Sequence, residues 1–199
     1  YSGLLSAVIR PAVKTCPIYA LDAPTKGSGK TYAAECIGTL ALGYEPPISP
    51  VARGDDSEIK KTLLPKLMQG ERVIIFDNIL GDFNSASLAA FVTSPTYSDR
   101  VLGSSQTLSL PNKSMVLLTG NNLALTHDMP RRCVVTRIDT GEENPLNAQH
   151  DLTALGGLKP DEFIKKNRQQ IALACITVIR YYLNTVTDKT KPRLTKDKV

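Results

Sequence analysis

The chain has 199 residues, of which 42% are hydrophobic and 22% are charged, and its formal net charge is +5 at pH 7. This composition excludes an intrinsically disordered or fibrous chain, and the length suits one α/β domain with a sizeable core. No apolar run approaches the roughly 20 residues of a membrane span, and no secretory signal is recognisable, so we expect a cytoplasmic protein without a membrane partner.

The N-terminal part of the sequence predicts a strand, a loop and a helix in direct succession. After a helical flank over residues 1–16, the apolar run over 17–21 is typical of a buried strand, and the pattern over 32–42 is typical of a helix. The loop between them contains the sequence GSGKT at residues 27–31. A glycine-rich turn at a helix N-terminus presents unpaired backbone N–H groups and the positive end of the helix dipole, and both attract phosphate. The sequence therefore predicts a loop that binds the phosphates of a nucleoside triphosphate.

Two side chains of this loop carry the expected chemistry. Lys30 is expected to reach the β and γ phosphates, and the Thr31 hydroxyl is expected to bind Mg²⁺. The pattern G-x-x-x-x-G-K-[ST] has glycine where this chain has Pro24, which is a departure. The alternative is a flexible polar loop that contains Gly-Lys-Thr by chance, and it leaves the flanking strand and helix unexplained. The residues expected to surround the phosphates are Pro24, Thr25, Lys26, Gly27, Ser28, Gly29, Lys30 and Thr31.

The next segment supplies a candidate metal ligand. The sequence predicts an edge strand near Ile48, a helix, and then a continuous apolar strand over 72–77. An apolar strand without alternation is typical of a parallel sheet that is covered on both faces. Asp77, at the end of this strand and followed by Asn78, is expected to hold Mg²⁺ through water. The alternative for Asp77 is an ordinary turn residue after a strand.

A third strand, predicted over 114–119, leads to the candidate Asn121. Between the second and third strands the sequence predicts a small helix over 84–92 and a hairpin over 100–110. Ligands of open α/β sheets bind at the carboxyl ends of the strands, so Asn121 is expected to orient the attacking water or to contact the γ phosphate. The alternative is a turn, for which Gly-Asn-Asn is suitable material.

Two arginines and a long helix complete the chain. Arg131 and Arg132 precede a fourth strand, predicted over 133–138, and they are either surface residues or an arginine finger that acts across a subunit interface. Strands alternating with helices predict an α/β fold with a mostly parallel central sheet flanked by helices, followed by a C-terminal helix. The remaining segments are a loop-rich connection over 141–160, a helix over 161–184 and a basic tail or linker over 185–199.

The loop at 27–31, the strand over 73–78, the segment 115–121 and the arginine pair resemble the motifs of a compact AAA+ ATPase. More narrowly, they resemble the superfamily 3 helicases of viruses and the related primase-helicases of phages, plasmids and integrated elements. The resemblance covers residues 17–140, where it implies a P-loop ATPase core, and it implies that the final helix is a lid. The catalytic residues that it implies are Lys30, Asp77, Asn78, Asn121, Arg131 and Arg132, and the metal contacts are Thr31 and Asp77.

The resemblance also implies ligands and partners. These are ATP and Mg²⁺, a homo-oligomeric ring, as a hexamer, with ATP at each subunit interface, and single-stranded or forked DNA in the central channel. Additional primase or DNA-binding domains of the same polypeptide and a location in a bacterial host or virus-infected cell follow from the same resemblance.

Two departures from the family pattern bear on function. The predicted hairpin stands where superfamily 3 enzymes carry a DNA-gripping loop, but its tip has no lysine or aromatic residue, which leaves Arg100 and Lys113 as the candidate nucleic-acid contacts. Asn78 stands where many members of the wider class have a glutamate that polarises water. An amide positions water but cannot take its proton, so either hydrolysis is slow or a carboxylate such as Glu35 or Asp82 supplies this step.

Four functions are compatible with these motifs to different degrees. The leading hypothesis is an ATP-driven DNA helicase or translocase of a mobile element, and the first alternative is a nucleotide-dependent loader or switch that does not unwind DNA. A small-molecule kinase would need a lid with several arginines and an acceptor pocket, and neither is recognisable between Asp77 and Asn121. A purely structural DNA-binding module is disfavoured because the lysine-dense segment is the tail.

Overall fold

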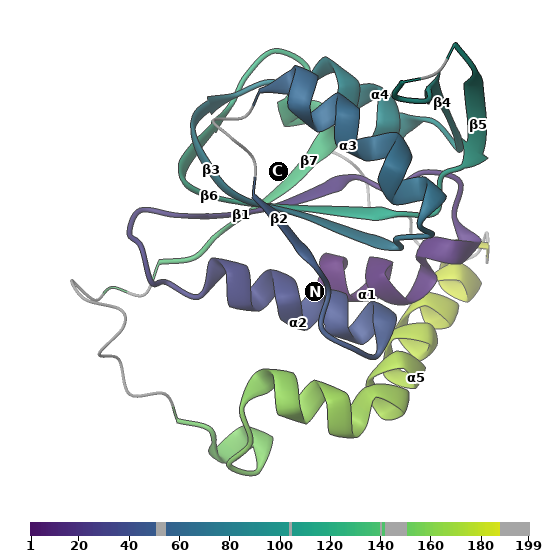
Figure 1. Ribbon diagram of the computed structural model, residues 1–199. Helices are drawn as coiled ribbons and strands as arrows, with labels where there is room; N and C mark the ends of the chain where they lie inside the picture. The colour runs from purple at the N-terminus through teal and green to yellow at the C-terminus, as the bar shows by residue number, and fades with distance from the viewer. Residues whose placement is uncertain (51–54, 104, 140, 142–150, 188–199) are drawn as a thin grey trace.

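The computed structural model describes residues 1–50, 55–103, 105–139, 141 and 151–187. Its centre is a five-stranded parallel sheet in the order β2–β3–β6–β1–β7, and an antiparallel pair, β4 and β5, stands beside it (Figure 1). The predicted α/β class, with a mostly parallel sheet flanked by helices and a C-terminal helix, is confirmed. The strands are β1 Ile18–Ala23, β2 Ile48–Pro50, β3 Val73–Phe83, β4 Thr96–Arg100, β5 Thr107–Pro111, β6 Met115–Leu125 and β7 Cys133–Arg137. The helices are α1 Ser2–Ile9, α2 Lys30–Leu42, α3 Asp56–Met68, α4 Ala86–Thr93 and α5 Pro160–Thr187, with 3-10 turns η1 Arg10–Ala12, η2 Met129–Arg132 and η4 Thr153–Leu155.

Helices cover both faces of the sheet (Figure 1). On one face lie α1 and α2, with α5 packed against them, and on the other lie α3 and α4. Successive side chains of β3 alternate between the two faces, so Ile74 and Phe76 join the cluster with α3 and α4, while Val73 and Ile75 join the cluster with α1 and α2. Because both faces are covered, the strand is apolar at every one of these positions.

The strand order determines where a ligand can bind. β1 lies between β6 and β7. After β1 the chain passes through α2 to β2, the outermost strand on the side of the sheet away from β7. In open α/β sheets the crevice for ligands lies outside the carboxyl ends of the strands, where the order of the strands reverses. The loop after β1 lies at the carboxyl ends of the strands, beside this crevice.

β3 and β6 are longer than the sequence predicts. We expected them to end near Asp77 and Thr119, which is wrong, because their pairing continues past a bulge as far as Phe83 opposite Leu125. The continuation depends on Gly120, where an added Cβ would lie 2.6 Å from the carbonyl oxygen of Ile79. The two strands therefore run on together beyond the end of β1 and curve upward in Figure 1.

The C-terminal helix α5 is bent and is attached to the body at its first turns. The backbone is non-helical at Asn167, and before this point the Tyr32 hydroxyl donates to Asp161 Oδ1 at 2.5 Å. Arg168 then donates to the carbonyl oxygens of Leu40 and Ala41 at the end of α2, at 2.8 and 2.9 Å. No helix among the described residues, α5 included, is long and apolar enough to cross a membrane. Of the connection expected over 141–160, residues 142–150 lie outside the described ranges, as do residues 188–199 of the tail expected over 185–199.

Candidate nucleotide-binding site

The glycine-rich loop turns directly from β1 into α2. Gly27 and Gly29 have φ values of 76° and 81°, which lie in the left-handed region that glycine adopts without strain. Gly29 is the N-cap of α2, so the helix begins at Lys30, two residues before the predicted start. The first N–H groups of a helix have no partner within it, so this turn directs main-chain donors and a partial positive charge into the loop.

Lys30 is held inside the loop. It is only 8% exposed, and its Nζ donates to the Thr25 carbonyl oxygen at 3.0 Å and to Ser28 Oγ at 2.9 Å. Burial lowers the pKa of Lys30, and the nearby carboxylates of Asp22 and Asp77 oppose this shift. Both hydrogen-bond acceptors are neutral, so the ammonium charge can be met by an anion such as phosphate.

The second part of the site joins α2 to two strands. Thr31 Oγ1 donates to Asp77 Oδ1 at 2.7 Å, and Thr119 Oγ1 on β6 donates to the same oxygen at 2.5 Å. The backbone N–H of Asn78 donates in turn to Thr119 Oγ1 at 3.1 Å. The structure thus brings together Thr31 and Asp77, which the sequence predicts as the metal contacts, and it adds Thr119, which the sequence did not single out.

These oxygens fit Mg²⁺. Hard cations prefer carboxylate, hydroxyl and water oxygens, and Mg²⁺ is usually held by one or two carboxylates together with substrate phosphates. Within the described ranges there is no group of three or more His, Cys, Asp or Glu side chains that could hold a metal. A cation here would therefore be held by the hydroxyl of Thr31 and the carboxylate of Asp77, with phosphate and water completing its shell.

Asn121 lies where the loop begins. Its strand position is opposite Ala23, the last residue of β1. Its Oδ1 is buried and has no hydrogen-bond partner, and no other side-chain oxygen or nitrogen among the described residues shares both properties. Buried polar atoms are nearly always satisfied, so an unpaired acceptor suits a ligand that donates a hydrogen bond, such as a water molecule.

Asp22 and Arg137 border the loop, and sequence reasoning missed both. Asp22 is buried at the end of β1, where its Oδ2 accepts from Arg137 Nη1 and its Oδ1 accepts from the N–H of Leu123, each at 2.8 Å. The sequence did contain a signal, because Asp22 ends an apolar strand directly before the loop in the same way as Asp77 ends another. Arg137 gave none, since only the pairing of β7 with β1 places it there.

A cavity of about 400 Å³ adjoins the first turns of α2. Its lining combines α1, β1, α2, the end of β7 and the start of α5, and it includes Tyr1, Tyr32, Ile138, Pro160 and Ile164. Apolar and aromatic walls of this kind suit the flat faces of a nucleobase. The sequence could not predict the cavity because its walls come from five separate elements.

Arg131 and Arg132 lie away from the loop of their own chain. The residue after them, Cys133, pairs with Ile18 at the start of β1, whereas the loop follows the end of β1, roughly 16 Å further along at the usual strand rise. Asp128 accepts hydrogen bonds from both arginines, and their side chains are 81% and 27% exposed respectively. These positions exclude a role for the pair at the loop of the same chain.

Of the two carboxylates that could replace the missing glutamate, only Glu35 is half-buried near the metal contacts. It stands one turn after Thr31 on α2, and burial raises its pKa, as do the carboxylates of Glu45, Asp77 and Asp161. Asp82 is exposed on the continuation of β3.

The candidate nucleic-acid contacts are not brought together. Arg100 pairs with Thr107 near the tip of the β4–β5 hairpin. Lys113 follows the other end of this hairpin, where Pro111 pairs with Thr96, and its Nζ donates to the Val13 carbonyl oxygen at 3.3 Å. The two cations therefore do not form one basic patch.

The chain was also compared with known proteins. It matches no protein-family model and no curated protein. Its function is therefore inferred from the geometry of the site and from the resemblance of its motifs.

Proposed function

We propose that this chain is an ATP-binding and ATP-hydrolysing motor domain with a P-loop core of the AAA+ type. Its role would be that of a replicative DNA helicase or translocase of a phage, plasmid or integrated element. The observation that carries the proposal is the convergence of Lys30 in its glycine-rich loop with the linked side chains of Thr31, Asp77 and Thr119. All of them lie at the edge of a parallel sheet where nucleotides bind.

In this proposal, different residues of the site have different roles in phosphoryl transfer. The loop N–H groups and Lys30 bind the β and γ phosphates, while Thr31 and Asp77 hold Mg²⁺, which when bound neutralises charge on the phosphate oxygens. Asn121 offers its unpaired Oδ1 to a proton of the attacking water. The cavity beside Tyr32 receives the base.

The arginine pair acts on a neighbouring subunit in this proposal. Arg131 is highly exposed and lies at the opposite end of β1 from the loop of its own chain. An arginine that reaches the γ phosphate of another subunit stabilises the charge of the transition state, and it requires a ring with ATP at the subunit interfaces. The DNA in the channel of this ring is inferred from the resemblance and from the exposed Arg100 on the hairpin.

The test is the DNA-stimulated ATPase activity of Lys30→Ala. Without the ammonium group we expect a loss of activity by a factor of about 100 or more, because a preorganised charge at the phosphates is removed. Lys14→Ala is the matched control, since Lys14 is exposed before β1 and far from the loop. Full activity of Lys30→Ala would contradict the proposal.

A second candidate function is a nucleotide-dependent loader or switch. It is favoured by Asn78, which is exposed, has a φ of 63° and carries an amide that cannot accept a proton from water. A loader is expected to bind and turn over ATP without separating strands. Strand displacement on a forked duplex distinguishes the two, because only the helicase releases the displaced strand.

A further inference from the structure

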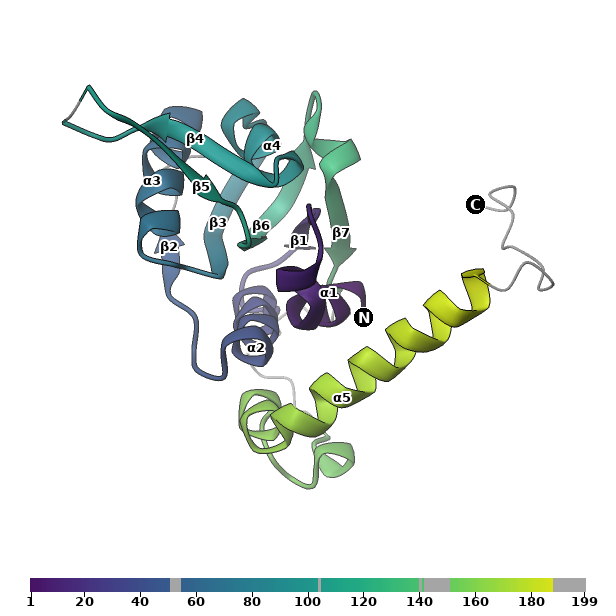
Figure 2. The same ribbon diagram turned by 90° about the vertical axis from the view of Figure 1, so that its right-hand side faces the viewer.

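The outer half of α5 projects from the body of the molecule (Figure 2). Cys175 of this helix is still buried, but Tyr182, two turns further along the same row of the helix, is 58% exposed. The helix has therefore lost its contact with the body before it ends.

The projecting part of the helix is apolar on several sides. Arg180 is its one charged side chain between residues 169 and 187. A helix that is apolar all round is normally buried, and an isolated helix of this length is marginally stable in water. The large apolar and aromatic side chains that are between 41% and 71% exposed include Leu173, Ile176, Val178, Tyr181 and Tyr182.

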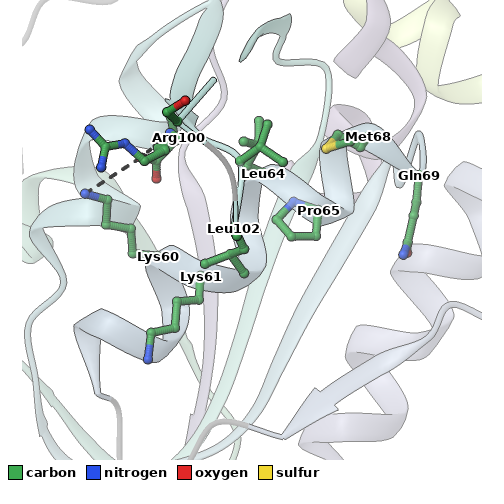
Figure 3. A pocket seen from close by; sticks show the side chains of 12 residues that line it. Lys60, Lys61, Leu64, Pro65, Met68, Gln69, Arg100 and Leu102 are labelled. Atoms are coloured by element: carbon green, nitrogen blue, oxygen red, sulfur yellow. Dashed lines mark hydrogen bonds and ion pairs between the residues drawn. The ribbon is translucent and has the colours of Figure 1, made fainter. Parts of the chain in front are cut away.

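A groove of about 920 Å³ lies between α3 on one side and the end of β4 with the turn after it on the other (Figure 3). Leu64, Pro65 and Leu102 form its middle, Met68 lies at one end, and Arg100 lies at the other (Figure 3). Met68 is 54% exposed and Leu102 is 64% exposed. An apolar groove with exposed side chains of this kind is the usual receptor for an apolar helix.

Figure 2 shows the projecting part of α5 on the opposite side of the molecule from α3 and β4, whose residues line the groove. We propose that the outer half of α5 of one copy docks into the groove between α3 and the end of β4 of the next copy. The two surfaces differ, so the contact is heterologous, and its repetition gives a ring where the rotation closes. The proposal goes beyond the nucleotide site, because it identifies the surfaces that join the subunits of the proposed ring.

The area of the helix favours a second copy as the occupant. The five exposed side chains named above present on the order of 600 Å² to solvent, which is comparable to the roughly 800 Å² per partner of a standard stable interface. The basic side chains at the groove, among them Lys60 and Arg100, meet no cluster of like charge, because Arg180 is the single charge of the helix between residues 169 and 187. Lys60 is itself paired with Asp99 at 3.9 Å, drawn as a dashed line in Figure 3.

The test is the mass of the full chain in solution over a range of concentrations. Met68→Lys introduces a charge into the groove, and Tyr181→Lys introduces one on the helix, where the side chain is 71% exposed. We expect each variant to raise the concentration needed for assembly roughly tenfold or more. Tyr44→Lys is the matched control, because Tyr44 is 63% exposed and lies outside both surfaces. It should assemble like the wild type.

Mixing the two variants tests the head-to-tail arrangement directly. Met68→Lys keeps an intact helix and Tyr181→Lys keeps an intact groove, so the mixture contains one usable pair of surfaces. We expect a dimer with one copy of each variant and nothing larger.

Three results would overturn the proposal. Dispersal by Tyr181→Lys but not by Met68→Lys would mean that the helix pairs with itself. Unchanged mass of Met68→Lys together with weaker DNA binding by Lys60→Ala, which removes a cation from the groove, would mean that the groove binds nucleic acid. A wild type that stays monomeric at every concentration, with and without Mg²⁺ and ATP, would exclude a second copy of the chain as the occupant of the groove. None of these measurements requires hydrolysis, so failure here is distinguishable from failure of the proposed ATPase.

Discussion

Asn121 combines a position beside the loop with a buried acceptor that has no partner. We predict that Asn121→Ala lowers kcat for ATP hydrolysis by about 100-fold, which is the effect expected when one preorganised group is removed from the transition state. We predict no loss in the free energy of unfolding, because no hydrogen bond of Oδ1 is removed. Steady-state kinetics and urea denaturation measure the two effects.

The neighbouring Asn122 provides the control for this prediction. It is exposed and has a φ of 49°, so Asn122→Gly keeps the backbone conformation while it removes a similar amide, whose Nδ2 makes a long hydrogen bond of 3.4 Å to the Pro24 carbonyl oxygen. This variant should retain its kcat. An Asn121→Ala variant that is as active as the wild type, or one that is destabilised while kcat is unchanged, would assign Asn121 a structural role.

Glu35 makes the stability of the protein depend on pH. Burial and nearby carboxylates raise the pKa of Glu35 in the folded protein, so its charged form opposes folding. This opposition is complete above the folded pKa, and it disappears as the pH falls below the ordinary value of a glutamate. Glu35→Gln should therefore be more stable than the wild type at pH 7, and the difference should vanish in acid. Thermal melts of both proteins across this range measure it, and a constant difference at all pH values would mean that the charge of Glu35 is not its cause.

At the scale of elements, continuous apolar runs were sufficient to predict the central strands β1, β3 and β6. Such runs are informative because a parallel strand covered on both faces needs apolar side chains at every position. The continuation of β3 and β6 to Phe83 and Leu125 could not be predicted in this way. It contains polar residues and glycine, and it exists because two segments far apart in the sequence pair with each other beyond a bulge.

The residues of the candidate site likewise fall into those that local sequence patterns predict and those that depend on long-range strand pairing. Lys30, Thr31 and Asp77 could be predicted, because a loop between a strand and a helix and an acid after a strand are local patterns. The ion pair between Asp22 and Arg137 joins residues 115 positions apart, and it depends on the order of the strands. The sequence likewise predicted a helix over 161–184, but it could not indicate that the outer half of this helix, α5, would lie outside the body.

A substitution at Gly120 tests the close pairing of β3 with β6. Gly120→Ala would place a Cβ 2.6 Å from the carbonyl oxygen of Ile79, so the backbone must shift at the step between β3 and β6. We predict a loss of about 1–3 kcal/mol in the free energy of unfolding, measured by chemical denaturation. Ala124→Ser, at an exposed position of the same strand, should change stability by less than about 0.5 kcal/mol. A Gly120→Ala variant of wild-type stability would mean that the two strands are not in close contact there.

At the scale of the whole molecule, the proposed function requires that subunits share their sites. Arg131→Ala should lower kcat by about 1,000-fold or more while nucleotide affinity is retained, because the arginine acts on the transition state. Mixing Arg131→Ala with Lys30→Ala should restore up to about a quarter of the wild-type activity, since that share of randomly formed interfaces combines an intact loop with an intact arginine. Activity that is not restored in mixed assemblies would contradict a role across the interface.

The proposed function depends above all on the binding of a nucleoside triphosphate and Mg²⁺ by the loop around Lys30. Calorimetric titration of the folded chain with ATP, in the presence and absence of Mg²⁺, tests this claim most directly. We predict saturable binding at roughly micromolar to millimolar concentrations, which Mg²⁺ strengthens and Lys30→Ala abolishes. Folded wild-type protein that binds no nucleotide with Mg²⁺ present would contradict the account.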